Sequence, residues 1–544
     1  MKKAHVKLIG TAIMITLVGS LMTGCGASKP TPSTDTTKTD AIKADDKSPL
    51  TLTIFDNNHN GGEFTDPVAV EITKRTGVTL QYLPNSGDAN EKLNLMLASN
   101  DLPDLVQISR GSDPMNKYIN AKAVIPLNDL IDKYGPNIKK SYGDTLKKIK
   151  SDDGKNYYLA DWFNSEVLKE PVFGFLMRKD YLKQLGLSQD KIDGTSPFTA
   201  DEFEGILKSF KEKNPKINGQ DSIPMTIWQE NFASGGIGTF QGMYGLKAYT
   251  IDGSNNLQLS YRDPKYLEML KYMNKLQSEG LIDQEWPANK KALWDQKLSG
   301  GAVLCTPDAY WNPGVADTLL KKQNVDSQFY PYKVVAPGVE AAQTTYGPTS
   351  VLGWDGCMIT KENKSPERTI QFLDFMASEE GQYLTQWGIK GVSWDLVNGK
   401  HEPLPNILDN FAKDFNKYST ESGIRKYAIV YKGGFGEDGT PYDMSVRYKR
   451  DEVATHAIKA LGDTCYDTSP LDNLGPDAGT PESLMATKID DISKSAIPKI
   501  MLSKNENEVV SLYTKMIKDM ESAGMSKVEK IRSENYKKRL ELWK

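Results

Sequence analysis

Residues 50–108, LTLTIFDNNHNGGEFTDPVAVEITKRTGVTLQYLPNSGDANEKLNLMLASNDLPDLVQI, indicate the fold class of this chain. Between its strands, residues 62–77 and 90–100 predict helices, and Gly77 supplies the left-handed residue with which many helices end. Alternating strands and helices are typical of α/β folds with mainly parallel sheets, so we predict that class. Three short runs rich in apolar and β-branched residues predict the strands: LTLTIFD at 50–56, VTLQYL at 78–83 and DLVQI at 104–108.

Helix signals continue farther along the chain. Thr199 and Glu202 have the spacing of a capping box, and Asp263 followed by Pro264 predicts another helix start. Beyond about Met485 the sequence predicts a run of C-terminal helices that pack on the outside of the fold. A length of 544 residues with 38% hydrophobic content suffices for two or more lobes.

The N-terminus predicts a secreted and anchored protein. A lysine-rich start and an apolar run too short to span a bilayer indicate a signal peptide over residues 1–24. The sequence LMTGC resembles the lipobox of bacterial lipoproteins, in which the cysteine, here Cys25, is acylated, although Met22 departs from the usual leucine. An ordinary signal peptide with a chance cysteine is the alternative. Residues 25–49 are rich in Pro, Thr, Ser and Asp and predict a disordered linker.

Composition and motifs exclude several function classes. The formal net charge of −4 shows no excess of positive charge, which nucleic-acid-binding proteins usually have. The four histidines do not have the spacing of zinc ligands. Residues 56–61, DNNHNG, resemble the first half of a calcium-binding loop, but Pro67 occupies the twelfth position, where such a loop has a glutamate ligand. No catalytic motif is recognisable, so we expect neither an enzyme nor a metal or other cofactor. Cys305, Cys357 and Cys465 are too scattered for a disulfide framework.

Aromatic residues in turn-rich segments are the positive functional signal. The chain has nine Trp and 25 Tyr, and several of the tryptophans stand beside Gly, Pro, Asp or Asn. Sugar rings stack their apolar faces on aromatic planes, while their hydroxyls pair with polar side chains, so such a set suits a carbohydrate site. For each tryptophan taken alone, packing in a core is the alternative.

Several segments together resemble the family 1 extracellular solute-binding proteins of bacterial ABC importers, in the long-chain branch of lipoproteins associated with oligosaccharide uptake. Each segment is weakly specific, but nine of them occur in the order of the family. They are ITKRTGVTLQY, LNLMLASNDLPDLVQI, IPLNDLIDKYGPNI, DGKNYYL, GFLMRKDYLKQLGL, FTADEFEGILKSFKEKNP, KLSGGAVL, ITKENKSPERTIQFLDFMASEEGQ and WGIKGVSW.

This resemblance implies a two-lobed periplasmic-binding-protein-like fold that closes on its ligand about a hinge. The expected N-terminal lobe comprises 50–171 and 300–337, and the C-terminal lobe comprises 172–299 and 338–470. We expect residues 471–544 to form a C-terminal helical extension packed on a lobe. Ligands of such folds lie beyond the carboxyl ends of the strands. The predicted ligand-binding residues are Asn57, Asn58, His59, Ser109, Arg110, Trp162, Trp228, Tyr310, Trp311, Trp354, Asp355 and Trp387.

The resemblance also implies a function. We expect a monomeric substrate-binding subunit of an ABC transporter, tethered by lipid to the outer face of a Gram-positive cell membrane, that captures an oligosaccharide and delivers it to the membrane permease. A lipoprotein that presents bound sugar to a sensor kinase and a surface-anchored glycoside hydrolase are the alternatives. Alginate-binding relatives carry an acidic calcium loop, but the corresponding NPKINGQDSIPM is short and has a single acidic residue, so metal dependence is not expected here.

Overall fold

A computed structural model of the chain describes residues 47–57, 62–444, 452–477 and 479–544. These residues fall within one unit of the chain, Ala44–Lys544. The predicted signal peptide, most of the predicted linker, and Asn58 and His59 lie outside the described residues. Within the described part, no helix is both long enough and apolar enough to cross a membrane.

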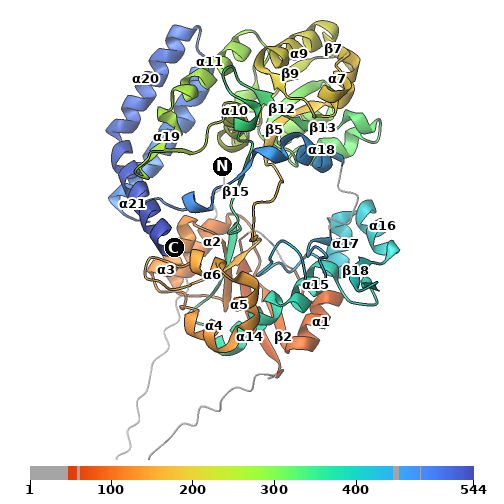
Figure 1. The fold of residues 1–544 in the computed structure, drawn as a ribbon, viewed down its shortest axis with the longest axis vertical. Coiled ribbons are helices and arrows are strands. Elements are labelled where there is room, and N and C mark those ends of the chain that lie inside the picture. The colour runs from red at the N-terminus through yellow and green to blue at the C-terminus, as the bar shows by residue number, and fades with distance from the viewer. Residues whose placement is uncertain (1–46, 58–61, 445–451, 478) are drawn as a thin grey trace, which may run out of the picture. The chain divides into compact units, whose positions relative to one another are not determined.

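The first sheet has five strands in the order β2-β1-β3-β16-β4 (Figure 1). β1 pairs in parallel with β2 and β3, whereas β16 is antiparallel to β3 and β4. α1 (Pro67–Thr76) joins β1 to β2, and α2 (Ala89–Ser99) joins β2 to β3, which confirms the predicted alternation of strands and helices. The strands are β1 (Leu50–Asp56), β2 (Val78–Tyr82), β3 (Leu105–Ser109), β4 (Leu159–Asp161) and β16 (Asp355–Ile359).

Local sequence sets the ends of these two helices. The Asp66 carboxylate caps the first turn of α1, and Pro67 occupies the first helical position, where its missing N–H is not needed. α1 ends at Gly77, whose φ of 74° is left-handed. Asp88 caps α2 in the same way, and Asn100 ends it with a φ of 56°. The local sequence therefore specifies where the two helices that connect β1, β2 and β3 begin and end.

The second sheet has four strands in the order β13-β5-β12-β9. β5 is antiparallel to β12 and β13, and β12 is parallel to β9. The strands are β5 (Phe173–Arg178), β9 (Ile223–Met225), β12 (Val303–Ala309) and β13 (Phe329–Tyr332).

The strand pairing corrects the predicted grouping of the chain into lobes. Residues 300–337 were expected with the first sheet, but their strands β12 and β13 pair with β5 in the second. Residues 338–470 were expected with the second sheet, but β16 lies between β3 and β4 in the first. All seven residues of β12 are buried, so both faces of this strand are covered, and its apolar residues belong to two hydrophobic clusters of the second sheet.

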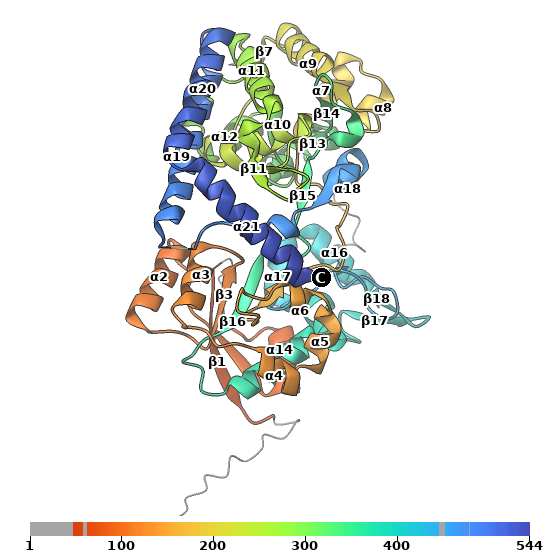
Figure 2. The ribbon, with the colours of Figure 1, turned by 60° about the vertical axis from the view of Figure 1, so that its left-hand side comes forward.

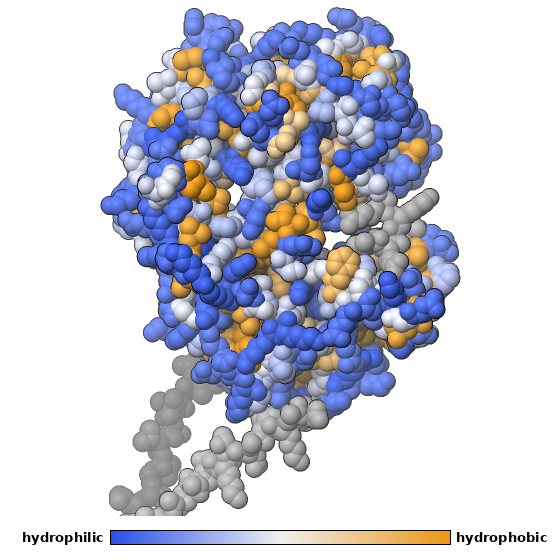
Figure 3. All heavy atoms as spheres, in the orientation of Figure 1, coloured by the Kyte–Doolittle hydropathy of each residue, from blue (hydrophilic) through white to orange (hydrophobic). Residues whose placement is uncertain are grey.

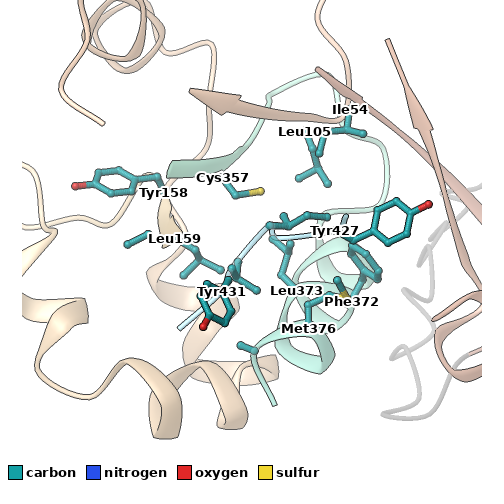
Figure 4. Packing of buried hydrophobic residues seen from close by; sticks show 14 of the residues in the cluster. Ile54, Leu105, Tyr158, Leu159, Cys357, Phe372, Leu373, Met376, Tyr427 and Tyr431 are labelled. Atoms are coloured by element: carbon teal, nitrogen blue, oxygen red, sulfur yellow. The ribbon is translucent and has the colours of Figure 1, made fainter. Parts of the chain in front are cut away.

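Each sheet has its own hydrophobic core. Figure 4 shows the first core, where Leu105, Leu159 and Cys357 of neighbouring strands lie near Leu373 and Met376 of α14 (Pro366–Ala377). The second core surrounds β5 and β12 and extends into the C-terminal helices. Separate cores allow the two sheets to keep their internal packing if the segments that join them bend.

Two of the three C-terminal helices pack on α11 (Pro264–Ser278), and the third packs on these two. Within this packing, the Asn274 side-chain amide donates to the carbonyls of Met501 and Ser503, at 2.9 and 2.7 Å. The last helix runs across the molecule in Figure 2. Glu529 of this helix accepts a hydrogen bond from the Leu259 N–H, and at the far end the Trp543 indole donates to the Lys148 carbonyl. The three helices are α19 (Pro481–Met501), α20 (Glu506–Ser522) and α21 (Met525–Trp543).

Segments 162–172 and 333–354 connect the two sheets. The second segment carries β15 (Gly347–Thr349), which pairs in parallel with β19 (Cys465–Asp467). The other strands are β6 (Phe198–Thr199), β7 (Lys216–Ile217), β8 (Gln220–Asp221), β10 (Tyr249–Ile251), β11 (Leu257–Leu259), β14 (Val334–Val335), β17 (Trp394–Val397) and β18 (Lys400–Pro403). The other helices are α3 (Asp113–Asn120), α4 (Asn128–Tyr134), α5 (Pro136–Tyr142), α6 (Thr145–Lys148), α7 (Lys179–Leu185), α8 (Gln189–Ile192), α9 (Ala200–Lys213), α10 (Ile237–Met243), α12 (Lys291–Ser299), α13 (Gly314–Leu320), α15 (Glu379–Trp387), α16 (Pro405–Lys413), α17 (Phe415–Ser422) and α18 (Glu452–Leu461).

Candidate functional site

One edge of the first sheet gathers the ends of four strands. β1 and β3 are parallel, so their carboxyl ends meet at this edge, and the antiparallel β16 begins there. The register places Asp355 opposite both Ser109 of β3 and Asp161 of β4. The residues that follow or precede these strand ends, among them Trp162 and Trp354, are therefore brought together by the sheet itself.

Trp162 and Trp354 form the aromatic part of this edge. Their rings stack with centroids 6.4 Å apart and an interplanar angle of 25°. Trp354 is 51% exposed, and Trp162 is half-buried. Trp162 has a φ of 59°, a left-handed backbone that costs a bulky residue roughly 1–2 kcal/mol. Gly353 allows this arrangement, because a Cβ there would lie 2.0 Å from the Asp161 carbonyl oxygen.

A loop from outside the sheet completes the edge. The Tyr431 ring packs edge-on against Trp162 with centroids 4.7 Å apart. The Arg425 guanidinium lies 5.8 Å from the centroid of the Trp162 ring and 3.5 Å from the Asp443 carboxylate. These two charged side chains place a cation and an anion beside exposed aromatic surface.

The buried carboxylate of Asp161 holds that loop in place. The Asp161 carboxylate is fully buried and accepts hydrogen bonds from the Tyr431 N–H, at 2.6 Å, and from the Gln107 amide, at 2.8 Å. Burial, followed by repulsion from Asp355 and Asp56, raises the pKa of Asp161 well above its ordinary value. Asp355 is 1% exposed, so the structure does not support its predicted role as a direct ligand contact.

The second sheet has a comparable edge. β9 and β12 are parallel, and the residues after their carboxyl ends include Trp228 and Trp311. Trp228 stacks on the buried Trp294 with centroids 5.6 Å apart, and the Lys291 ammonium lies 5.4 Å from the Trp228 ring. Trp311 is 55% exposed and packs edge-on against the half-buried Tyr310. Aromatic surface is therefore present at both strand edges.

Asp308, the penultimate residue of β12, is the polar centre of this second edge. Its Oδ1 accepts hydrogen bonds from the side-chain amides of Asn231, at 2.7 Å, and Asn312, at 2.8 Å, and from the Ala309 N–H. Burial raises the pKa of Asp308 to about 6. Asp308 therefore orders the loops that carry Trp228 and Trp311.

The remaining predicted residues have different surroundings. The Asn57 amide donates to the Ser109 hydroxyl at 3.2 Å, so these two residues meet at the first edge. Arg110 is ion-paired with Asp472, and its side chain is 7% exposed. Trp387 is fully buried, and its indole N–H donates to the carbonyl of Tyr442. The predicted ligand role of Trp387 is wrong because its ring belongs to the first core.

Sequence reasoning missed four residues of the two edges. Asp308 follows an apolar run near the carboxyl end of β12, as Asp56 does at the end of β1, and this signal was available in the sequence. Arg425, Tyr431 and Asp443 lie in a segment without a regular strand or helix, so no periodicity indicated them.

Aromatic planes with hydrogen-bonding groups beside them suit a ligand that has apolar ring faces and hydroxyl groups. Figure 3 shows that one face of the molecule is hollowed between the part that carries β5 and β12 and the part that carries β1 and β3, with apolar side chains in the hollow. Among the described residues, no group of three or more His, Cys, Asp or Glu side chains could hold a metal ion.

Comparison with known proteins places this geometry in a family. Residues 68–393, more than half of the chain, match the family described as bacterial extracellular solute-binding protein. The fructooligosaccharide ABC transporter substrate-binding protein FusA of Streptococcus pneumoniae is 28% identical over 70% of this chain and 71% of its own length. Lipoprotein LipO of Bacillus subtilis is 25% identical over 61% of this chain and 65% of its own.

A solved structure shares the fold. The structure of FusA of S. pneumoniae in complex with kestose aligns with a TM-score of 0.61 at 20% identity, and the alignment covers 90% of this chain and 99% of that chain. The two-sheet architecture described above is thus a periplasmic-binding-protein-like fold, as predicted.

Proposed function

The chain belongs to the bacterial extracellular solute-binding proteins, and from this premise we propose that it captures an oligosaccharide for an ABC importer. The proposal rests on one observation: both strand edges carry partly exposed tryptophans beside hydrogen-bonding side chains. Trp162 and Trp354 lie at the first edge, and Trp228 and Trp311 at the second. A sugar ring that enters between aromatic planes loses little hydrogen bonding, because its hydroxyls remain at the polar margins.

In the proposed mechanism the two edges close on the sugar. Segments 162–172 and 333–354 act as the hinge, because each joins one core to the other. Closure buries apolar ring faces against tryptophan and so supplies the energy that favours the closed form. The closed protein then presents a surface that the membrane permease recognises, while the open protein does not.

Anchoring is the second part of the proposal. Cys25 carries the lipid, and residues 26–49 tether the binding unit to the outer face of the membrane. The relative LipO is named a lipoprotein, which supports this assignment. A single acyl chain binds membranes only weakly, so we expect a doubly or triply acylated N-terminus.

The test is a titration of the purified protein with sugars of increasing length. Kestose, fructose and a set of neutral and acidic oligosaccharides are added while the intrinsic tryptophan fluorescence and the melting temperature are recorded. A bound sugar at 100 times its Kd adds about 2.7 kcal/mol to the free energy of unfolding, which raises the melting temperature measurably.

We expect at least one oligosaccharide to change both signals and its component monosaccharides to act much more weakly. If no sugar in the set changes either signal, the proposal is contradicted. Turnover of any sugar by the protein would favour the hydrolase alternative, and is checked by chromatography of the same mixtures.

A further inference from the structure

The last helix, α21, joins the two parts of the fold. The first part is the one built on the first sheet, and the second part is the one built on the second sheet. In Figure 2, α21 begins beside α19 and α20 of the second part and ends beside α6 of the first. This link is separate from the connecting segments 162–172 and 333–354, and it therefore bears on how the two parts can move.

Buried polar groups fix the first half of α21 to the second part. The Glu529 carboxylate accepts hydrogen bonds from the Leu259 N–H and from the Arg262 guanidinium, both at 2.9 Å. The Ser533 hydroxyl accepts a hydrogen bond from the Leu257 N–H at 2.8 Å. Glu529 and Ser533 are only 6% and 5% exposed, and a buried polar group that loses its partner is costly. This half of the helix therefore stays with the second part.

The following turn of α21 lies against the proposed hinge. The Arg539 guanidinium donates to the carbonyls of Pro470 and Asp472. Just before these two residues, β19 pairs with β15, which belongs to the connecting segment 333–354. The helix thus passes from one part of the fold to the other beside a segment that joins the two cores.

Trp543 attaches the end of α21 to the first part. Its half-buried ring packs against the first core, and its indole N–H donates to the Lys148 carbonyl of α6 at 3.3 Å. The Lys148 ammonium lies 5.5 Å from the centroid of the Trp543 ring. Hydrogen bonds from N–H to oxygen are usually about 2.7–3.2 Å long, so a small displacement of this end of the helix breaks the bond.

The two attachments of α21 differ in strength, and this decides which one yields on closure. When the parts rotate about segments 162–172 and 333–354, a continuous helix that is fixed to the second part moves with that part. We propose that Trp543 is a latch, whose contact with α6 holds the two parts at the separation seen in this structure and breaks when a bound sugar closes them. The inference rests on the proposed function, because it requires closure on a sugar.

Such a latch lowers the affinity for sugar. A ligand that binds only one form of a protein has an apparent affinity reduced by the fraction of molecules in that form. The contacts of Trp543 stabilise the form without sugar, so each binding event has to break them. A protein that lacks these contacts should bind the sugar about fivefold more tightly, which is the effect of one lost hydrogen bond.

The test compares Trp543→Ala and Trp543→Phe with the wild type. The alanine removes the ring and its N–H, whereas the phenylalanine keeps a ring and removes only the N–H. Calorimetric titration with kestose and the other oligosaccharides of the binding screen should give an affinity about fivefold higher for Trp543→Ala, with Trp543→Phe in between. Leu542→Ala is the matched control: this neighbour on α21 is 39% exposed, and its variant should bind with wild-type affinity.

Hydrogen exchange supplies a readout that a purely structural role of Trp543 would not move. In the wild type, the amides of residues 540–544 should exchange faster at saturating sugar, because the helix end loses its support and frays. The amides of residues 525–533 should keep their rates, since that half of α21 stays on the second part. A tryptophan that only stabilises the fold predicts no change at 540–544 when sugar is added.

Three results overturn the inference, and they separate it from the proposed function. If the wild type binds an oligosaccharide and Trp543→Ala binds it equally or more weakly, the contact does not oppose closure and the proposed function stands. Unchanged exchange at 540–544 under saturation means that the contact persists in the closed form, and the latch again fails alone. If the wild type binds no oligosaccharide, the proposed function fails, and the latch fails with it because no sugar closes the two parts.

Discussion

Trp162 and Trp354 stack with ring centroids 6.4 Å apart, although 191 positions of sequence separate them. The pair exists because β4 ends and β16 begins at the same edge of the first sheet. Trp354 exposes about half of its surface, and Trp162 adopts a left-handed backbone to reach it. Strained residues are concentrated at functional sites, which supports a role for this pair in binding.

Replacement of Trp354 by Ala should separate binding from stability. Because the side chain is 51% exposed, the melting temperature should hardly change, while sugar binding should weaken by about 1 kcal/mol or more. Trp387→Ala is the matched control: its ring is fully buried, so the loss should be about 3–5 kcal/mol of unfolding free energy. Thermal unfolding and sugar titration of both variants check this. Early melting of the Trp354 variant with unaltered affinity would place this ring in the core.

The contrast between these two tryptophans shows where sequence reasoning stops. Both stand beside a glycine, and the local sequence gives them similar environments. Trp387 lies four residues after Tyr383 on α15, a spacing that puts both side chains on one face of the helix and indicates burial. Trp354 lies in a connecting segment without periodicity, so only the sheet register shows that it meets Trp162.

Strand partners were equally hard to predict. Caps and turn residues such as Asp66 and Gly77 define the first βα units locally, and the fold class follows from them. By contrast, all seven residues of β12 are buried and its sequence does not alternate between apolar and polar positions, so the sequence does not show which strand pairs with it. That choice depends on packing between distant segments, and for this reason the grouping of 300–337 was wrong.

Cys25→Ala should release the protein from the membrane or block its processing. Cys25 lies outside the described residues, and the lipid on it is the proposed anchor. Cys465→Ala changes a half-buried free cysteine and should leave the protein anchored. Membrane fractionation with immunoblotting measures both. A Cys25→Ala protein that is correctly cleaved and still bound to membranes would contradict lipid anchoring.

Sugar binding should reduce the radius of gyration measured by small-angle scattering. Two separate cores can approach each other if segments 162–172 and 333–354 bend and if the end of α21, where the Trp543 indole donates to the Lys148 carbonyl, shifts on the first part. The Trp354→Ala variant at the same sugar concentration should show a smaller change, in proportion to its occupancy. An unchanged profile of the wild type at proven saturation would exclude closure.

The buried Arg110–Asp472 ion pair should stabilise the fold far more than an exposed one. Arg110 also donates to the Gly353 carbonyl and the Ser350 hydroxyl, each at 2.9 Å, so its removal leaves several groups unpaired. We expect Arg110→Ala to cost about 3 kcal/mol. Lys117→Ala, which breaks the exposed pair with Asp113, should cost about 0.5 kcal/mol or less. Urea unfolding compares the two, and equal losses would refute the structural role of Arg110.

Asp308→Asn should change how stability depends on pH. Burial raises the pKa of Asp308 from an ordinary value of 3.8 to about 6, so between these pH values the folded protein binds more protons than the unfolded chain. As the pH rises from about 4 to 6, the folded protein loses the proton bound to Asp308, and this loss lowers the free energy of unfolding of the wild type.

The asparagine variant lacks this titration. All three N–H groups that contact Asp308 donate to its Oδ1, and an asparagine oxygen can accept them in the same place. The variant should thus be more stable than the wild type by up to about 3 kcal/mol at pH 7.5, and this difference should vanish near pH 4. Urea unfolding at the two pH values measures the difference. The same difference at both pH values would mean that the Asp308 carboxyl group does not titrate in this range.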